Sequence, residues 1–186
     1  MFSDIASVKR GLTYSPSDVV KKGIRVLRSS NIDVDRFVTF EEDVFVDKNV
    51  ISIEYAENGD ILITSACGSQ NLIGKHAKID NITPNSAVCG GFMLVAKSDY
   101  PDFLNASMSS KWYLGFLSTN VSGGNGAIGN LNAKELENQS IYFPKKDERS
   151  KIGDLFRRLD DLISLHQRKL EKLKNIKKAM LEKMFI

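Results

Sequence analysis

The chain has 186 residues, of which 42% are apolar and 26% are charged, a composition typical of a soluble globular protein. No apolar run approaches the roughly 18 to 20 residues that cross a bilayer, and the residues after Met1 lack the basic and apolar stretches of a secretory signal, so we expect a cytoplasmic protein with no membrane partner. Two cysteines, Cys67 and Cys89, are too few for a disulfide scaffold and predict buried, reduced thiols.

The net charge of +3 divides unevenly along the chain. Residues 145–186 carry 13 Lys and Arg against 7 Asp and Glu, whereas residues 1–144 carry 13 against 16. A basic tail of this kind suits a polyanion, an acidic partner or a plain solvated helix.

The first 144 residues contain short runs of the type that forms strands. These runs are rich in Val, Ile, Phe and Thr and are separated by Gly, Asn, Asp and Ser clusters: Ile24–Leu27, Phe37–Phe40, Asp60–Thr64, Lys75–Ile79, Ala87–Ala96 and Ile141–Phe143. Residues from Asp102 to Thr119 have the three- and four-residue spacing of a helix, with an aromatic stripe that fits a core face. Residues 133–138 predict a further short helix. The pattern predicts an α+β domain over residues 1–144, strand-rich with an inserted helix.

The sequence changes character after Pro144. Residues from Lys146 to Met184 contain no Pro and only one Gly, Gly153, which predicts one helix of about 39 residues and about 58 Å. Its apolar positions repeat every seven residues, with a second row three or four residues later, as in a coiled coil. The stripe that they form contains Ile152, Leu155, Phe156, Leu159, Leu162, Ile163, His166, Leu170, Leu173, Ile176, Met180 and Met184. We therefore expect residues 145–186 to be a long spacer and dimerisation helix.

This apolar stripe needs a partner. A domain of about 140 residues has a radius of gyration near 14 Å, so much of a helix of about 58 Å would extend into water. We expect the stripe to pack against a second long helix, from another copy of the chain or from a different subunit; packing on its own domain is the alternative. His166 would be a polar interruption that fixes register or orientation, and we assign it no catalytic role.

The candidate catalytic and metal-binding motifs lack the context that their chemistry needs. Residues 124–129 have the spacing of a dinucleotide-binding loop, but a predicted helix rather than a strand precedes them, and we interpret them as a tightly turning loop. Cys67, His76, Cys89 and His166 lack the short paired spacings of a zinc site, and no Gly-x-Ser-x-Gly nucleophile motif is present. We assign no catalytic residue, no metal and no cofactor to the chain.

Polar loops after the predicted strands carry side chains suited to reading DNA. Arg and Lys favour guanine edges, Asn and Gln favour adenine edges, and Ser and Lys also bind phosphates. The DNA-binding candidates are Arg28, Ser29, Gln70, Asn71 and Lys75, with Lys111 and Asn125 as weaker ones. Turns are built from the same residue types, so a role in a turn or a helix cap is the alternative for each.

Three stretches together resemble the specificity subunit of type I restriction-modification systems. The first is Asp4–Gly11 (DIASVKRG) with Ile24–Ile32 (IRVLRSSNI), and the second is Asn58–Thr64 (NGDILIT). The third joins Leu131–Leu136, Ile141–Pro144 (IYFP) and the helix from Glu148 to Leu173. The likeness is strongest from Ile141 onward and weakest in the recognition loops, which differ among family members with different targets.

The resemblance implies a division of labour. Members of that family usually carry two target-recognition domains joined by two long antiparallel helices. Each domain reads one half of a split DNA site, and the helices space the halves and dock the modification subunits. Modification subunits methylate adenine with S-adenosylmethionine and restriction subunits cut DNA with ATP, so both cofactors belong to partner subunits. This chain departs from the pattern because it has only one recognition domain and one long helix. It is either a half-length subunit that dimerises, or a fragment or a remnant.

On this interpretation the chain is a non-catalytic specificity subunit that binds double-stranded DNA, modification subunits and restriction subunits. We expect two copies to pack antiparallel through Ile152–Met184 and to read a gapped palindrome, because two-fold symmetry in the protein requires it in the site. Two alternatives stay open. One is a coiled-coil interaction protein or decoy that binds modification subunits without reading DNA. The other is an independent enzyme that binds a nucleotide at residues 124–129.

Overall fold

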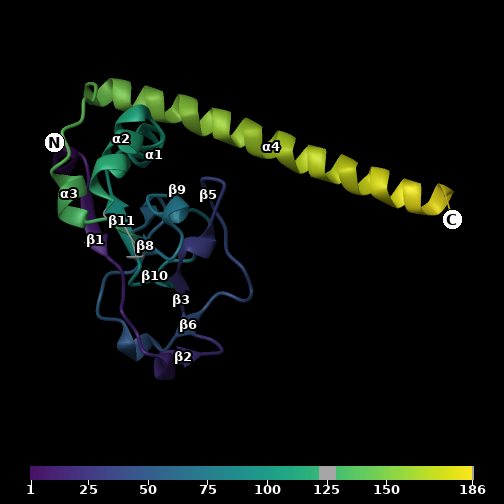
Figure 1. Ribbon diagram of the computed structural model, residues 1–186, viewed down its shortest axis with the longest axis horizontal. Coiled ribbons are helices and arrows are strands. Elements are labelled where there is room, and N and C mark those ends of the chain that lie inside the picture. The colour runs from purple at the N-terminus through teal and green to yellow at the C-terminus, as the bar shows by residue number, and fades with distance from the viewer. Residues whose placement is uncertain (122–128, 186) are drawn as a thin grey trace.

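The computed structural model describes residues 1–121 and 129–185, apart from the side chain of Gln70. A strand-rich domain carries one long helix that extends away from it (Figure 1). The strands are β1 (Ser7–Arg10), β2 (Val19–Val20), β3 (Ile24–Leu27), β4 (Ile32–Asp33), β5 (Arg36–Phe37), β6 (Phe45–Val46), β7 (Ile61–Thr64), β8 (Ala66–Cys67), β9 (His76–Lys78), β10 (Ala87–Cys89), β11 (Met93–Lys97) and β12 (Gly129–Asn130). The α-helices are α1 (Pro101–Met108), α2 (Lys111–Asn120), α3 (Ala133–Glu137) and α4 (Lys146–Met184). The predicted α+β class is confirmed.

The first sheet has four antiparallel strands in the order β1-β11-β7-β9. All four residues of the inner strand β7 are buried, and alternate side chains serve two cores. Ile61 and Ile63 pack into the core that this sheet makes with α1, α2 and α3, whereas Leu62 packs on the other side. Buried side chains on both faces explain why this segment is a continuous apolar run in the sequence.

The second sheet has the order β10-β3-β6-β2 and contains one parallel pair, β10 with β3. Leu27 and Ala87 from this sheet meet Leu62 and Val95 from the first sheet in a second core. A smaller third core, which includes Val26 and Val88, lies on the opposite face. The two small sheets β12-β8 and β4-β5 are attached to this frame. The parallel pair places the end of β3 beside the end of β10.

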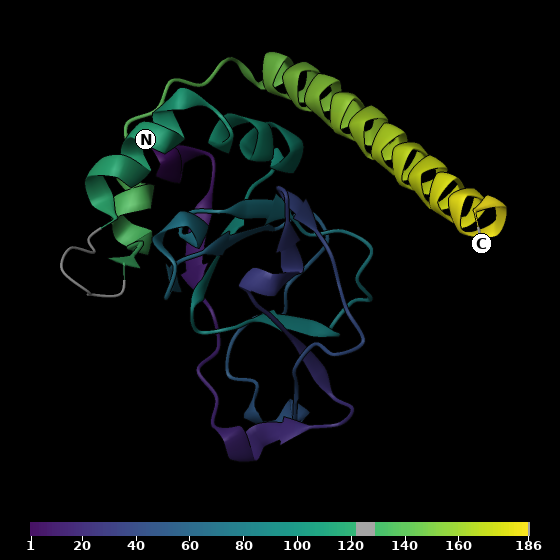
Figure 2. The same cartoon turned by 45° about the vertical axis from the view of Figure 1, so that its right-hand side comes forward.

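Helix α4 begins and ends at the predicted residues, Lys146 and Met184. The Glu148 carboxylate accepts the Lys145 backbone N–H at 3.1 Å, and the Arg149 guanidinium donates to the Pro144 carbonyl at 2.8 Å. The same guanidinium lies over the ring of Phe143, 4.7 Å from its centroid. Figure 2 shows the helix continuing well past the domain after its first turns. Within the described residues, no helix is long and apolar enough to cross a membrane.

Several predicted boundaries are wrong, each for a local reason. The helix predicted over 102–119 is two helices, because Ser110 adopts an extended backbone (φ −96°, ψ 172°) between α1 and α2. The strand predicted over Ala87–Ala96 is divided between the two sheets, since the chain turns at residues 90–92. Residues Ile141–Phe143 form no strand, and Phe37–Phe40 contributes only its first residue to β5.

Candidate DNA interface

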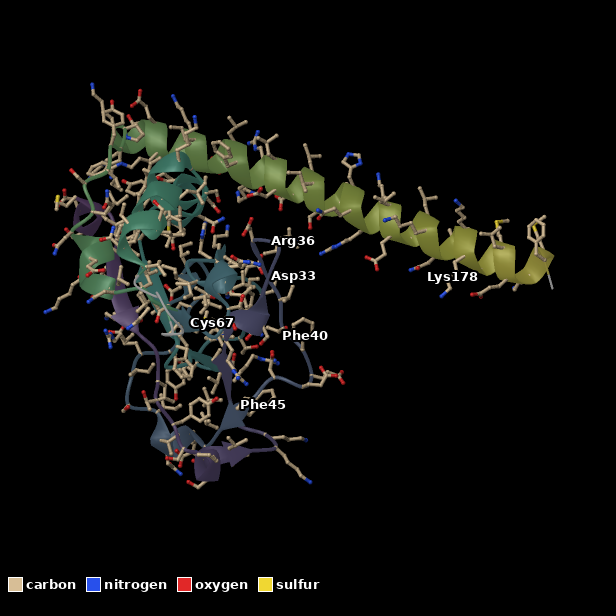
Figure 3. All side chains as sticks on the ribbon, in the orientation of Figure 1. Asp33, Arg36, Phe40, Phe45, Cys67 and Lys178 are labelled. Atoms are coloured by element: carbon tan, nitrogen blue, oxygen red, sulfur yellow. The ribbon has the colours of Figure 1, made fainter. Side chains whose placement is uncertain are left out.

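One cleft of the domain lies where the ends of β3, β8 and β10 converge. Its volume is about 680 Å³. Cys67, labelled in Figure 3, belongs to its wall. The wall is mainly apolar but includes a guanidinium and hydroxyl groups: Leu12, Thr13, Tyr14, Pro16, Val19, Arg28, Ser29, Val44, Ala66, Cys67, Gly68, Gly90, Gly91, Phe92 and Met93. Two of the predicted DNA-binding residues, Arg28 and Ser29, therefore lie together on the wall of one cleft.

Arg28 is exposed at the end of β3 and is held there by a buried amide. Asn31 is fully buried. Its Oδ1 accepts the Arg28 backbone N–H at 2.8 Å, and its Nδ2 donates to the Val38 carbonyl and to the Asp43 carboxylate, both at 3.0 Å. Because a buried polar group must keep its partners, Asn31 is an anchor for the turn. The Arg28 side chain projects from a fixed backbone.

The turn between β10 and β11 presents an aromatic ring that the sequence analysis missed. Phe92 is 73% exposed, yet its carbonyl accepts backbone N–H groups from Ser65 at 2.9 Å and Ala66 at 3.1 Å. A Cβ at Gly91 would lie 3.1 Å from the Thr13 hydroxyl and 3.2 Å from the Leu12 carbonyl oxygen, so this turn packs tightly on the segment after β1. A rigid backbone with an exposed ring suits stacking on a base or contact with a thymine methyl. The Gly-Gly-Phe sequence inside a predicted strand was the available signal.

The next loop along the cleft follows β8. Strand β8 pairs with β12, with Cys67 opposite Gly129, and residues 70–72 then form a short 3-10 helix. Asn71 is exposed, and Gln70 lies beside it in this turn. Asn125 and most of the Gly124–Gly129 loop lie outside the described residues.

The two predicted lysines do not line the cleft. Lys75 is half-buried between residues 70–72 and β9, and its carbonyl accepts the Thr64 backbone N–H at 2.8 Å. Lys111 is exposed at the first residue of α2, whose Tyr113 and Phe116 pack in the core. The structure thus brings Arg28 and Ser29 together and leaves Lys111 on a separate element.

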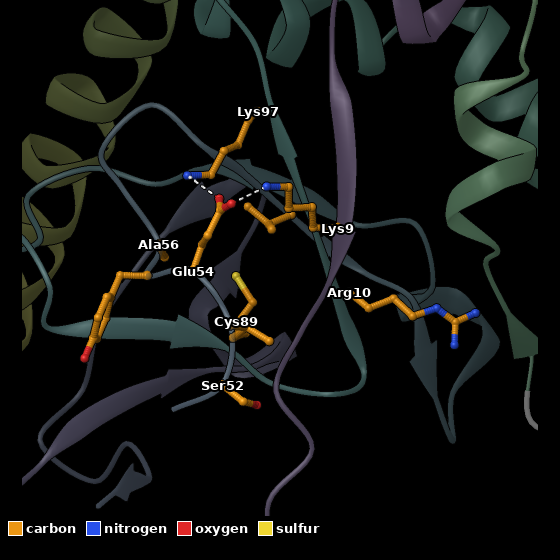
Figure 4. Close-up of a pocket in the computed structure, with 10 residues that line it drawn as sticks. Lys9, Arg10, Ser52, Glu54, Ala56, Cys89 and Lys97 are labelled. Atoms are coloured by element: carbon orange, nitrogen blue, oxygen red, sulfur yellow. Dashed lines mark hydrogen bonds and ion pairs between the residues drawn. The ribbon is translucent and has the colours of Figure 1, made fainter. Parts of the chain in front are cut away.

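In a second hollow, of about 490 Å³, which Arg10 also lines, the ammonium groups of Lys9 and Lys97 are paired with Glu54 (Figure 4). The Glu54 carboxylate lies 2.5 Å from the Lys9 ammonium and 3.5 Å from the Lys97 ammonium. The hydrogen bond from Lys9 is the main reason that the pKa of Glu54 is lowered. Since these cations already have carboxylate partners, this hollow is a weaker candidate for binding phosphates than the cleft.

The two thiols differ in environment. Cys89 is buried, and burial raises the pKa of its thiol to about 12, as expected for a structural cysteine. Cys67 is only partly buried because it borders the cleft, which corrects the expectation that both thiols are buried. Among residues 1–121 and 129–185, no group of three or more His, Cys, Asp or Glu is arranged to hold a metal ion.

The apolar stripe of α4 is turned away from the domain. Gly153, Arg157 and Ser164 face the domain, and at 100° per residue they lie opposite the stripe. Most stripe residues are 44–63% exposed: Leu155, Phe156, Leu159, Leu162, Ile163, Leu170, Leu173, Ile176 and Met180. His166 is exposed among them. Ile152 differs because it is half-buried against the domain's first core, so its own domain already covers part of the predicted dimer contact.

Comparison with protein families identifies the class to which this arrangement belongs. The pattern that defines the type I restriction modification DNA specificity domain matches residues 2–175. The chain therefore belongs to that family, and the predicted resemblance is confirmed. No curated protein matches the chain.

Solved structures share the fold. Over 98% of this chain, a protein from a study titled "Structural basis underlying complex assembly and conformational transition of the type I R-M system" superimposes with a TM-score of 0.64. The HsdS subunit from Thermoanaerobacter tengcongensis matches over 99% with a TM-score of 0.59, and the S subunit of the type I system from M. genitalium over 97% with a TM-score of 0.51. Each is 15% identical in sequence, and this chain spans 44%, 43% and 46% of their respective lengths.

Proposed function

We propose that the chain is a non-catalytic DNA-sequence specificity subunit that directs adenine methylation and DNA cleavage by partner subunits of a type I restriction-modification complex. It would act as an antiparallel homodimer that reads a gapped palindrome in the cytoplasm. The observation that carries the proposal is the position of α4. Its polar face packs on the recognition domain, and its apolar face is turned outward over about 30 residues, or about 45 Å.

The recognition cleft supports the DNA-reading half of this proposal. Arg28 and Ser29 lie on its wall, and Gln70 and Asn71 follow directly after it along the chain. These side chains would read base edges in the major groove, while Lys75 and, more weakly, Lys111 would bind phosphates. Asn125, which lies outside the described residues, is the remaining weaker candidate. Phe92 joins this set because its ring is exposed and it lines the same cleft as Arg28.

The apolar face of α4 supports the dimer. If two stripes overlap end to end from Leu155 to Met184, the two-fold axis passes near Leu170. Arg149, whose guanidinium lies over the Tyr100 ring, and Ser164 bound the part of α4 that contacts the domain. The midpoint between them lies about 13 residues from that axis, or about 20 Å along the helix. The centres of the two domain contacts would then lie about 40 Å apart along the helix axis, with the two domains on the outer sides of the helix pair.

The chemistry in this proposal belongs to other subunits. Modification subunits would dock on the paired α4 helices and methylate adenine with S-adenosylmethionine, and restriction subunits would cut DNA with ATP. This chain would supply binding and orientation of the DNA only.

The decisive experiment is co-expression with the cognate modification subunit, followed by genome-wide mapping of methylated adenines. A gapped palindrome is expected. An asymmetric motif would instead indicate pairing with a different half-subunit. Assembly with the modification subunit without any sequence-dependent methylation would refute the proposal and favour the decoy.

Substitutions then separate readers from phosphate contacts. Gln70→Ala should relax one position of the motif at a cost of about 1–3 kcal/mol. Lys75→Ala should weaken binding to all sequences alike and reduce its salt dependence. Arg28→Ala and Gln70→Ala variants that keep the wild-type motif and affinity would show that the assignments are wrong.

A further inference from the structure

The domain holds α4 at points spread along one polar face of the helix. The first is the segment from Arg149 to Gly153, where the Arg149 guanidinium lies over the Tyr100 ring and a Cβ at Gly153 would lie only 2.8 Å from the Phe103 backbone nitrogen of α1. Arg157 is the second, with its Nε 3.7 Å from the Asp102 carboxylate. Lys78 on β9 binds the same carboxylate, which ties this contact to the first sheet.

The last contact comes from a different part of the domain. The Arg36 guanidinium of β5 donates to the Ser164 hydroxyl of α4 at 2.7 Å, across 128 positions of sequence. Figure 3 shows Arg36 directly beneath the helix. Gly153 and Ser164 are 11 residues apart, or about 16 Å along the axis. Without the Arg36 contact, the points that hold α4 would extend only from Arg149 to Arg157, 8 residues or about 12 Å. The contact at Ser164 nearly doubles this length.

The hairpin that carries Arg36 has an unusual turn. Val34 and Asp35 join β4 to β5 with φ of +45° and +62°, the geometry in which hairpins normally place Asn or Gly. Val34 is β-branched, so the left-handed conformation is unfavourable for it, and its side chain is 69% exposed. The exposed side chain contributes little packing to offset this cost. The turn does place Arg36 under α4.

The direction of α4 has a large effect at its far end. Twenty residues, or about 30 Å, follow Ser164. A tilt of about 10° would move the end of that segment by about 5 Å, more than the roughly 3.4 Å rise of one base pair. In the dimer the lever is the distance of about 20 Å from the middle of the domain contact to the two-fold axis, over which the same tilt moves each domain by about 3 Å. The two copies together would then change the distance between half-sites by about 7 Å, which is more than one base pair.

We propose that the β4–β5 hairpin braces α4 through the Arg36–Ser164 hydrogen bond, and that Arg36 thereby determines the number of base pairs between two half-sites. This inference rests on the proposed function, because it needs a dimer that reads DNA. Arg36 acts as a positioning residue through α4 and contacts no base.

Two measurements test the brace. The first uses spin labels at Lys48→Cys and Lys178→Cys in a Cys67→Ser background, with excess unlabelled chain so that distances within one copy are measured. Wild type should give a narrow distance distribution. Arg36→Ala and Ser164→Ala should both broaden it. The second variant also guards against misfolding, since alanine favours a helix. Arg168→Ala, which removes an exposed guanidinium one turn beyond Ser164, should leave the distribution narrow.

The second measurement maps methylated adenines in cells that express each variant with the modification subunit. Wild type and Arg168→Ala should give one spacer length, whereas Arg36→Ala and Ser164→Ala should also methylate sites one base pair longer or shorter. A narrow distance distribution in both brace variants, or a single unchanged spacer, would overturn the proposal. If the wild-type chain directs no methylation at all, the proposed function fails, and the distance distributions still decide whether the hairpin fixes α4.

Discussion

Leu173 offers a direct test of the dimer. It lies on the apolar stripe of α4 and is 63% exposed. Full burial of a leucine contributes about 1.5–3 kcal/mol, so covering this remaining surface contributes about 1–2 kcal/mol per copy. Each dimer contains the residue twice. Leu173→Glu should therefore weaken dimerisation by at least about 2–4 kcal/mol, which raises the Kd roughly 30- to 700-fold. Burial of the new carboxylate would add to this loss.

Sedimentation equilibrium over a range of protein concentrations measures the effect. Asn175→Glu is the matched control, because it introduces the same side chain two residues away on the opposite side of the helix, where it is exposed. Circular dichroism of both variants should show the helical content of wild type. The domain core should be unaffected, since neither position contacts it.

The outcome distinguishes two explanations for the stripe. A selective loss of dimer in Leu173→Glu is expected. Equal dimerisation of the two variants, or a wild-type chain that stays monomeric at micromolar concentration alone and with the modification subunit, would refute the reasoning. The stripe would then have to be covered by a different subunit.

Three further outcomes are expected. Arg28→Ala should weaken specific DNA binding by about 1–3 kcal/mol and relax one position of the methylated motif; an unchanged motif and affinity would remove Arg28 from the interface. At about pH 8 a thiol reagent should modify Cys67 and spare Cys89, which is buried and has a pKa of about 12. Specific DNA should slow the modification of Cys67. Equal rates of modification with and without DNA would contradict DNA binding in the cleft. Burial lowers the pKa of His76 below 6.5, so as the pH falls the imidazole of the unfolded state becomes protonated at a higher pH than that of the folded state. The free energy of unfolding should therefore fall as the pH drops below about 6.5, by at most about 1.4 kcal/mol per pH unit. His76→Leu should lose this dependence and His166→Ala should keep it; urea titrations at several pH values provide the measurement, and identical slopes in both variants would argue against His76.

The resemblance and the long helix were predictable from the sequence because each depends on local information. No proline interrupts residues 146–184, and the seven-residue repeat continues along them, so the helix period and its limits follow from neighbouring residues. The buried strand β7 was predictable for the same reason, since its continuous apolar run provides side chains that pack into the cores on both faces of the sheet.

Local information failed where the path of the chain depends on distant partners. Ala87–Ala96 has continuous strand propensity, yet residues 90–92 turn because Gly90 donates to the Leu27 carbonyl at 2.8 Å and Phe92 accepts from Ser65 and Ala66. These partners are 25 residues or more away in sequence. For the same reason the exposed ring of Phe92 could not be distinguished from a strand residue that packs in the core.

The types of residue in the candidate DNA interface were partly predictable from the sequence, but the position of the interface on the domain was not. The sequence by itself determined that polar side chains follow β3 and β8 and that an apolar stripe lies on α4. Only the tertiary structure decided that Arg28 and Ser29 share one cleft, that Asn31 is their buried anchor, and that the domain grips the polar face of α4. The physical reason is that the spacing of residues along the sequence defines which of them share a helix face. Which face then packs on the domain depends on close contacts between segments that are distant in the sequence. Here a glycine at 153 lets α1 approach, and the apolar face is left for a partner.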